Sequence, residues 1–351
     1  MRLGPARLLL AGGRLIPGTI EVEDGTITGI DAGAGIPDGI LAPGFIDLQV
    51  NGRGGVDVAT AAGAEWEQLE RAAVAQGVTA WCPTLVTAPL DAYQAPLARI
   101  AEAKERLATI IGAHLEGPFL GGAPGAHATA HIVGAALSWI AELPKVVRVV
   151  TLAPEAPNAL EAIELLHRGG VTVSLGHSTA TFSQTLQAVE AGATLVTHLF
   201  NGMGPLHHRH PGLLGAALSD DRLAVSIIAD GRHVAGPLVR LAFRVKPAGR
   251  VVLVTDAVAS DHFEMVDGLP RLADGIIAGS TLGMDEAVRN AVDFGVSRED
   301  ALVAATTAPA DVVGLADRGR LAVGARADLC LLDDDLAPRQ VWVAGTLAWE
   351  R

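Results

Sequence analysis

Residues 251–257, Val-Val-Leu-Val-Thr-Asp-Ala, decide the fold. Four apolar, mostly β-branched residues in a row are typical of a buried strand. The polar pair Thr255 and Asp256 follows where that strand should end. A buried carboxylate is costly unless a cation or a hydrogen-bond donor meets it. Asp256 could simply cap a helix or form an Asx turn, so the rest of the chain has to decide between structure and chemistry.

Seven similar apolar runs precede this stretch and alternate with amphipathic helical segments. The eight predicted strands are 45–50, 79–83, 109–114, 146–152, 171–175, 194–197, 223–228 and 251–255. Predicted helices lie at 64–76, 90–107, 158–168, 181–191, 237–244 and 285–294, with a further capped helix at 297–305. Repeated alternation of strand and helix over residues 44–316 predicts an α/β fold, a (β/α)8 TIM-type barrel.

The two ends of the chain have a different pattern. Residues 1–43 are short strands separated by turns such as Glu23-Asp24-Gly25, with no helical period. Residues 317–351 return to short strands at 319–321 and 327–332 and end in a hairpin-like unit at 341–347. We therefore expect the two ends to pair into one small β-sandwich domain beside the catalytic barrel.

Composition narrows the class of protein. The 351 residues are 50% hydrophobic and 19% charged, which fits a globular protein with one large core. A net charge of −13 without a Lys/Arg-rich block argues against nucleic acid as a partner. No run approaches about 18 uninterrupted apolar residues, so no membrane span is expected. Cys82 and Cys330 form no metal-type spacing and no disulfide framework, and we expect a cytoplasmic protein.

Polar residues that follow the predicted strands are the candidate site. Barrel enzymes carry their sites at the carboxyl ends of the strands, where this chain has Glu116, His177, His198 and Asp256. A single His there is often only a hydrogen-bonded structural residue. Two imidazoles and a carboxylate together are a common hydrolytic zinc set that leaves a position open for water. Asp256 could then take a proton from that water and return it to a leaving nitrogen, so the set predicts a metal-dependent hydrolase.

Several motifs resemble those of one known family. They are His114-Leu-Glu-Gly-Pro-Phe119, Gly176-His-Ser178, His198-Leu-Phe-Asn-Gly-Met203, Leu253-Val-Thr-Asp-Ala257 and the stretch from Ala42 to Gly52. In this order and over essentially the whole chain, they resemble the N-acetylglucosamine-6-phosphate deacetylases of the amidohydrolase superfamily. That family combines a (β/α)8 barrel with a small β-sandwich made from both chain ends. The resemblance implies hydrolysis of N-acetylglucosamine 6-phosphate to glucosamine 6-phosphate and acetate, in amino-sugar catabolism or recycling.

The resemblance also implies a role for each matching residue. Glu116, His177 and His198 would bind the metal, Asp256 would be the catalytic carboxylate, and His127 would help to polarise the acetyl carbonyl. The implied substrate-binding positions are Gln49, Ala126, His127, Asn201, Gly202, Arg209, His233, Ile277, Ala278 and Gly279. In this family a partner subunit completes the phosphate pocket, so a homodimer is implied. A phosphate needs cations or free N–H groups, which the loop 207–210 offers unless it is only a solvated polar loop.

The chain departs from the superfamily at the end of the first strand. Many amidohydrolases have His-x-His there and bind two metals, whereas this chain has Gln49-Val50-Asn51. An amide is a poor zinc ligand compared with imidazole. We therefore predict one divalent metal ion per chain, with Gln49 left to contact water or substrate. Zn2+ fits the ligand types, although Fe2+, Co2+ or Mn2+ could occupy the same site.

Two departures lie near the expected sugar-phosphate site. His210 stands where related proteins often have Glu, and the loop between Glu116 and His127 is short. Two alternatives therefore stay open beside the leading hypothesis. One is deacylation of another N-acyl hexosamine phosphate, such as the galactosamine or mannosamine isomer, or of a related amide. The other is a catalytically dead barrel that senses a sugar phosphate or binds a partner protein.

Overall fold

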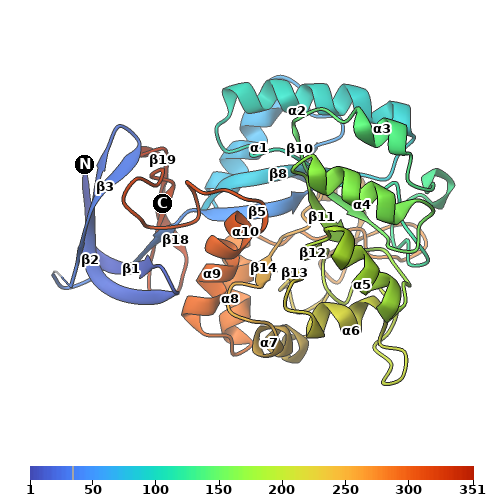
Figure 1. Ribbon diagram of the computed structural model, residues 1–351. Helices are drawn as coiled ribbons and strands as arrows, with labels where there is room; N and C mark the ends of the chain where they lie inside the picture. The colour runs from blue at the N-terminus through green and yellow to red at the C-terminus, as the bar shows by residue number, and fades with distance from the viewer. Residues whose placement is uncertain (34) are drawn as a thin grey trace.

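The computed structural model describes residues 1–33 and 35–351 and has two parts (Figure 1). The larger part, on the right of Figure 1, is a parallel sheet surrounded by helices. The smaller part, on the left, is a separate sheet in which both termini lie. Among the described residues, no helix has both the length and the apolar character that a membrane span requires.

Eight parallel strands form the barrel. They are β5 (Phe45–Val50), β8 (Val78–Val86), β9 (Ala113–Glu116), β10 (Val147–Leu152), β11 (Thr172–Leu175), β12 (Leu195–Val196), β13 (Ala224–Ile227) and β14 (Val251–Leu253). Each strand pairs with the next one along the chain. The ring closes because the Asp256 N–H donates to the Gln49 carbonyl at 3.0 Å and the Asn51 N–H donates to the Ala257 carbonyl at 2.8 Å. The predicted (β/α)8 barrel is confirmed.

Most of the helices that cover the barrel follow the predicted segments. They are α1 (Glu65–Val74), α2 (Gln94–Arg106), α4 (Ala159–Arg168), α5 (Phe182–Ala191), α7 (Gly236–Val245), α8 (Met284–Asp293) and α9 (Arg298–Ala305). Sequence reasoning missed α3 (Leu137–Ala141), α6 (Gly212–Ser219) and α10 (Thr307–Val312). Helix α6 is almost entirely apolar and mostly buried, so it has no amphipathic period that would reveal it. The helices α3 and α10 are too short for a clear period.

The third barrel strand begins later than predicted. The sequence places it at 109–114, whereas β9 is Ala113–Glu116. Gly112 precedes it with a φ of 149°, and Ile110 forms only an isolated bridge with Trp81. Glu116 is therefore the last residue of β9 and not a residue beyond its end, which fixes its side chain more firmly at the mouth of the barrel.

The two chain ends form a single seven-stranded sheet. Its order is β19 (Thr346–Glu350), β18 (Pro338–Val343), β17 (Leu329–Leu332), β4 (Ile40–Pro43), β1 (Arg2–Leu10), β2 (Arg14–Glu23) and β3 (Thr26–Ala32). The ends meet at β4, which pairs with β1 on one side and β17 on the other. Leu8, Ile20, Ile27 and Trp342 belong to a separate hydrophobic core there. The predicted strand at 319–321 is an irregular segment.

A chain of buried polar groups crosses the inside of the barrel. His114 Nδ1 lies 2.9 Å from the Leu48 carbonyl, which can only accept, so Nδ1 carries the proton and Nε2 accepts from the Thr151 hydroxyl at 2.8 Å. Thr151 must then accept from Thr197 at 2.7 Å, and Thr197 from Ser174 at 2.6 Å. Burial lowers the pKa of His114 to about 4 and keeps the ring neutral. The direction of every bond in this chain is thus fixed.

Replacing Thr151 by Val should lower the free energy of unfolding. The substitution nearly preserves the volume but leaves His114 Nε2 without its donor, and an unpaired buried polar group costs about 1–3 kcal/mol. Urea titration of both proteins measures the difference. Thr194→Val is the matched control, because Thr194 is half-buried and no side-chain hydrogen bond of it is found in the described part of the chain. Equal losses in the two variants would contradict this role of Thr151.

Candidate active site

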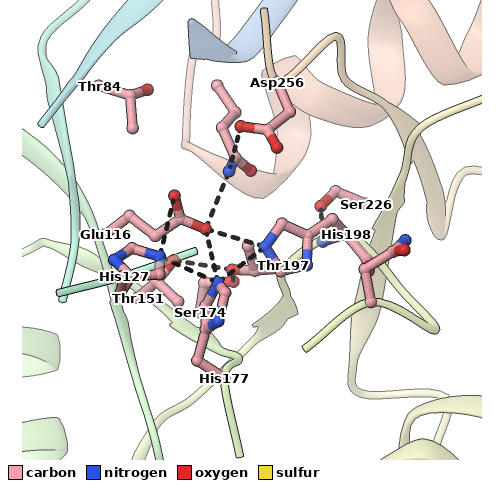
Figure 2. A network of polar contacts seen from close by, with 12 residues as sticks. Thr84, Glu116, His127, Thr151, Ser174, His177, Thr197, His198, Ser226 and Asp256 are labelled. Atoms are coloured by element: carbon pink, nitrogen blue, oxygen red, sulfur yellow. Dashed lines mark hydrogen bonds and ion pairs between the residues drawn. The ribbon is translucent and has the colours of Figure 1, made fainter. Parts of the chain in front are cut away.

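The strand ends bring Glu116, His177 and His198 into one cluster at the mouth of the barrel (Figure 2). Glu116 Oε1 lies 2.9 Å from His198 Nε2 and 3.1 Å from His177 Nε2, and the two nitrogens are 3.0 Å apart. Ligand atoms that bind one small cation at about 2.0–2.1 Å lie about 3.0–3.4 Å from one another in octahedral or tetrahedral geometry. The three atoms therefore have the spacing of a single metal site.

The protonation of the cluster agrees with that reading. His177 Nδ1 lies 3.1 Å from the Ala123 carbonyl and must donate to it, so the lone pair of Nε2 faces Glu116 and His198. Burial opposes charge on both Glu116 and His198. The hydrogen bond and attraction to Glu116 nevertheless raise the pKa of His198, and the contacts with His177 and His198 hold the pKa of Glu116 well below its usual range. A divalent cation bound between Glu116 and His198 would replace the proton that these two side chains share.

His127 lies beside this cluster, with its Nε2 3.2 Å from His177 Nε2 and 3.7 Å from Glu116 Oε2. By distance alone, Glu116, His127 and His177 could also hold a metal. However, the backbone N–H of Thr87 donates to His127 Nδ1 at 3.3 Å, so the neutral ring carries its proton on Nε2. Burial and the neighbouring His177 lower the pKa of His127 to about 3. A protonated nitrogen donates instead of ligating, which favours His198 as the third ligand.

Two amides hold the carboxylate of Asp256. Its Oδ1 accepts from Asn51 Nδ2 at 2.7 Å and from Gln49 Nε2 at 3.0 Å, and Gln49 Nε2 also lies 3.0 Å from Glu116 Oε1. The buried Gln49 thus links both carboxylates and does not line the cavity above them. Burial and the charge of Glu116 raise the pKa of Asp256 to about 7. A carboxylate with a pKa near neutrality is suited to both accepting and returning a proton.

The backbone turns sharply at the functional residues. His177, His198 and Asp256 have φ values of 50°, 29° and 50°, a region that residues other than glycine seldom adopt. Gly202, with a φ of 57°, packs against His177, where a Cβ would lie 2.8 Å from Nδ1. The Asp256 carbonyl accepts from the Ser280 N–H at 2.8 Å. Such strain persists only where the surroundings enforce it, and it is common at active sites.

A cavity of about 610 Å³ opens above the cluster. Its wall includes Ala126, His127, Asn201, Gly202, His233, Ile277, Ala278 and Gly279, eight of the positions implied by the family resemblance. His233 Nδ1 is held by Asp230 Oδ2 at 2.6 Å. Arg209 is exposed on the loop 207–210, lies 2.9 Å from His208, and does not line this cavity. The volume suits a ligand of the size of a hexose phosphate.

Sequence reasoning missed several residues of this wall. Asn51, Asp57, Phe263 and Arg271 also line the cavity, and neither the strand pattern nor the family resemblance marks them as site residues. Asn51 could have been predicted, because residues i and i+2 of a strand point to the same face and Gln49 is an implied substrate-binding position. Arg271 lies in a hairpin that follows β14, and no local sequence pattern indicates that this hairpin lies over the barrel.

The fold and this arrangement define a metal-dependent hydrolase on a (β/α)8 barrel. Residues 40–348 match the model of the Amidohydrolase family, and the chain belongs to that family.

The similar proteins within the family are named as deacetylases of N-acetylated amino-sugar 6-phosphates. The chain is 40% identical to the N-acetylglucosamine-6-phosphate deacetylase of Bos taurus, over 89% of this chain and 84% of the relative. It is 38% identical to the N-acetylgalactosamine-6-phosphate deacetylase of Escherichia coli, over 97% of both. The crystal structure of N-acetylglucosamine-6-phosphate deacetylase from Thermotoga maritima superposes with a TM-score of 0.95 at 32% identity over the full length of both chains. The Mycobacterium smegmatis enzyme, solved with N-acetyl-D-glucosamine-6-phosphate, gives 0.91 at 35% identity over 99% of this chain and 98% of that one.

Proposed function

We propose that the chain hydrolyses the acetamide of N-acetylglucosamine 6-phosphate, giving glucosamine 6-phosphate and acetate. The observation that carries this proposal is the convergence of Glu116, His177, His198 and Asp256 at the floor of a cavity of suitable size. The similarity to deacetylases of amino-sugar phosphates along most of the chain supports the same reaction. The alternative of a catalytically dead barrel is disfavoured because the ligand set and the acid–base carboxylate are both in place.

The residues divide the chemistry between them. Glu116, His177 and His198 would hold one divalent ion, which when bound supplies a Lewis acid for the carbonyl and lowers the pKa of the attacking water. The Asp256 carboxylate takes a proton from that water as the water oxygen bonds to the acetyl carbon. Asp256 then gives the proton to the amine nitrogen as the C–N bond breaks, releasing glucosamine 6-phosphate and acetate. His127 Nε2–H donates to the carbonyl oxygen while negative charge develops on it.

Substitution of His127 separates its role as a donor from that of a metal ligand. His127→Ala should lower kcat by about 10²- to 10³-fold, the usual effect of losing one donor to a developing oxyanion. His127→Gln, whose amide can still donate, should lose less. Metal content, measured by elemental analysis, should stay at one ion per chain in both variants. Loss of the metal from these variants would instead make His127 a ligand.

The galactosamine isomer is the second candidate substrate. The chain is nearly as similar to an N-acetylgalactosamine-6-phosphate deacetylase as to the glucosamine enzymes, and it covers more of that relative. Initial rates of acetate release from the 6-phosphates of N-acetylglucosamine, N-acetylgalactosamine and N-acetylmannosamine test the choice. The proposal expects the largest kcat/KM for the glucosamine isomer. A larger value for either other isomer would reassign the substrate while keeping the reaction.

The ion, the assembly and the location are part of the same proposal. We propose Zn2+, which suits one carboxylate and two imidazoles. A homodimer is supported by Arg209, which lies outside the cavity of its own chain, and by the exposed apolar side chains Leu238, Leu241 and Val245 of α7. A cytoplasmic location is supported by the free, buried thiols of Cys82 and Cys330, as expected in a reducing compartment.

A further inference from the structure

The barrel strand β10 supplies none of the proposed metal ligands, although it lies between two strands that do. Its neighbours are β9, which ends in Glu116, and β11, which His177 follows two residues later. The loop after β10 carries Glu155, a half-buried carboxylate that does not line the active-site cavity. Glu155 is thus placed to act through the neighbouring loops and not on the substrate itself.

The carboxylate of Glu155 accepts hydrogen bonds from the loops on both sides. From the loop after β11, the Thr179 N–H donates to Oε1 at 2.6 Å and the Ser178 hydroxyl donates to Oε2 at 2.6 Å. From the loop after β9, the Gly122 N–H donates to Oε1 at 3.2 Å. Hydrogen bonds to an ionised acceptor are roughly twice as strong as those between neutral groups. One side chain therefore joins the two loops.

The loop after β9 in turn holds the ring of His177. The Gly121 N–H donates to the His177 carbonyl at 2.9 Å, and His177 Nδ1 donates to the Ala123 carbonyl at 3.1 Å. Gly122, which donates to Glu155, lies between these two contacts. The hydrogen bond of the second ring nitrogen fixes the tautomer and orientation of a histidine that binds a metal. Glu155 therefore restrains the segment whose carbonyl sets the tautomer of His177.

The backbone on both sides of Glu155 leaves little room for another arrangement. His177 has a φ of 50°, a conformation that persists only where neighbouring contacts enforce it. The hydrogen bonds of Ser178 and Thr179 to Glu155 begin at the next residue. On the opposite side, a Cβ on Gly121 would lie 2.1 Å from Glu155 Oε1, so a glycine is needed to admit the carboxylate. The conformation of His177 and the position of Glu155 thus depend on each other.

We propose that Glu155 is a positioning residue that holds His177 in the orientation required for metal binding. Its carboxylate does so by tying the loop after β11 to the loop after β9, without contact to metal or substrate. The inference rests on the proposed function, since it takes His177 as one of the metal ligands. It gives β10 a part in the metal site that no ligand on that strand provides.

The zinc affinity of Glu155→Ala, measured by competition with a chromogenic chelator, tests the proposal. The dissociation constant should rise by about 10- to 100-fold, the usual effect of losing a group that orients a metal ligand. Glu155→Gln should lie between Glu155→Ala and the unaltered protein. Its amide oxygen can still accept from the two N–H groups, and its NH2 group can donate to the Ser178 hydroxyl oxygen.

Asp333→Ala is the matched control. The Asp333 carboxylate also accepts from two backbone N–H groups, those of Asp335 at 3.1 Å and Ala337 at 2.9 Å, but it lies in the small sheet domain after β17. Both alanine substitutions should lower the free energy of unfolding, whereas only Glu155→Ala should weaken zinc binding. An unchanged zinc affinity in Glu155→Ala, or an equal loss in Asp333→Ala, would overturn the proposal.

If the unaltered protein binds no zinc, the proposed metal site fails instead. Nitrogen-15 NMR of the His177 ring then still decides the inference, recorded on metal-free protein at a pH well above the usual histidine pKa of about 6.5. The unaltered protein should carry the ring proton on Nδ1, as the contact with Ala123 requires, and Glu155→Ala should show a mixture of both tautomers. The same single tautomer in both proteins would contradict the role of Glu155.

Discussion

Replacing Asp256 by Asn should lower kcat by about 10²- to 10⁴-fold, the contribution typical of a positioned general acid–base group. The substitution is nearly isosteric and keeps an oxygen that can accept from Gln49 and Asn51, which hold Oδ1 at 3.0 and 2.7 Å. What it removes is the ability to take a proton from water and return it to the amine. Rates of acetate release from the sugar phosphate, compared at saturating substrate, measure the loss.

Metal content is the control for that experiment. Asp256→Asn should retain one ion per chain, because Glu116, His177 and His198 supply the ligands without it. A variant that is inactive and also free of metal would make Asp256 a ligand. A variant that keeps both metal and turnover would remove Asp256 from the proton transfer altogether.

His177→Asn should lose both the ion and the activity. His177 Nε2 lies 3.1 Å from Glu116 Oε1 and 3.0 Å from His198 Nε2, so the substitution removes one of the three proposed metal ligands. Metal chemistry contributes several kcal/mol, so kcat/KM should fall by about 10³-fold or more. Elemental analysis and kinetics on the same preparation measure both effects.

An exposed histidine supplies the comparison for His177. His167 lies on the outer side of α4, and His167→Asn makes the same chemical change away from the barrel mouth. It should retain metal and full activity. Normal activity in His177→Asn would show that the cluster is not the metal site.

The sequence could predict the centre of the site because barrel topology converts strand ends into neighbours. Glu116, His177, His198 and Asp256 are far apart in the chain, yet each lies at or just past the end of a parallel strand, and those ends meet at one mouth. The register of β9 was less predictable, since Gly112 delays its start. The barrel and the pairing of both chain ends followed from periodicity alone.

The supporting contacts could not be predicted in the same way. The tautomer of His127 depends on the backbone N–H of Thr87, forty positions earlier. Every residue except proline has such an N–H, so the sequence does not show which one donates to His127. The family resemblance implies Arg209 as a substrate-binding position and gives no role to Arg271, yet of the two arginines Arg271 is the one that lines the cavity. Loops that follow strands have no sequence periodicity that determines where their side chains point. The residues of a cavity wall built from such loops can therefore be identified only from the structure.

Metal-free protein can be titrated with Zn2+ while acetate release from N-acetylglucosamine 6-phosphate is recorded, which tests whether one metal ion per chain supports deacetylation. We expect no turnover without metal, a linear rise in rate and a plateau at one equivalent per chain. Activity in the metal-free protein, or a plateau that requires two equivalents, would contradict a deacetylase built on the single site of Glu116, His177 and His198.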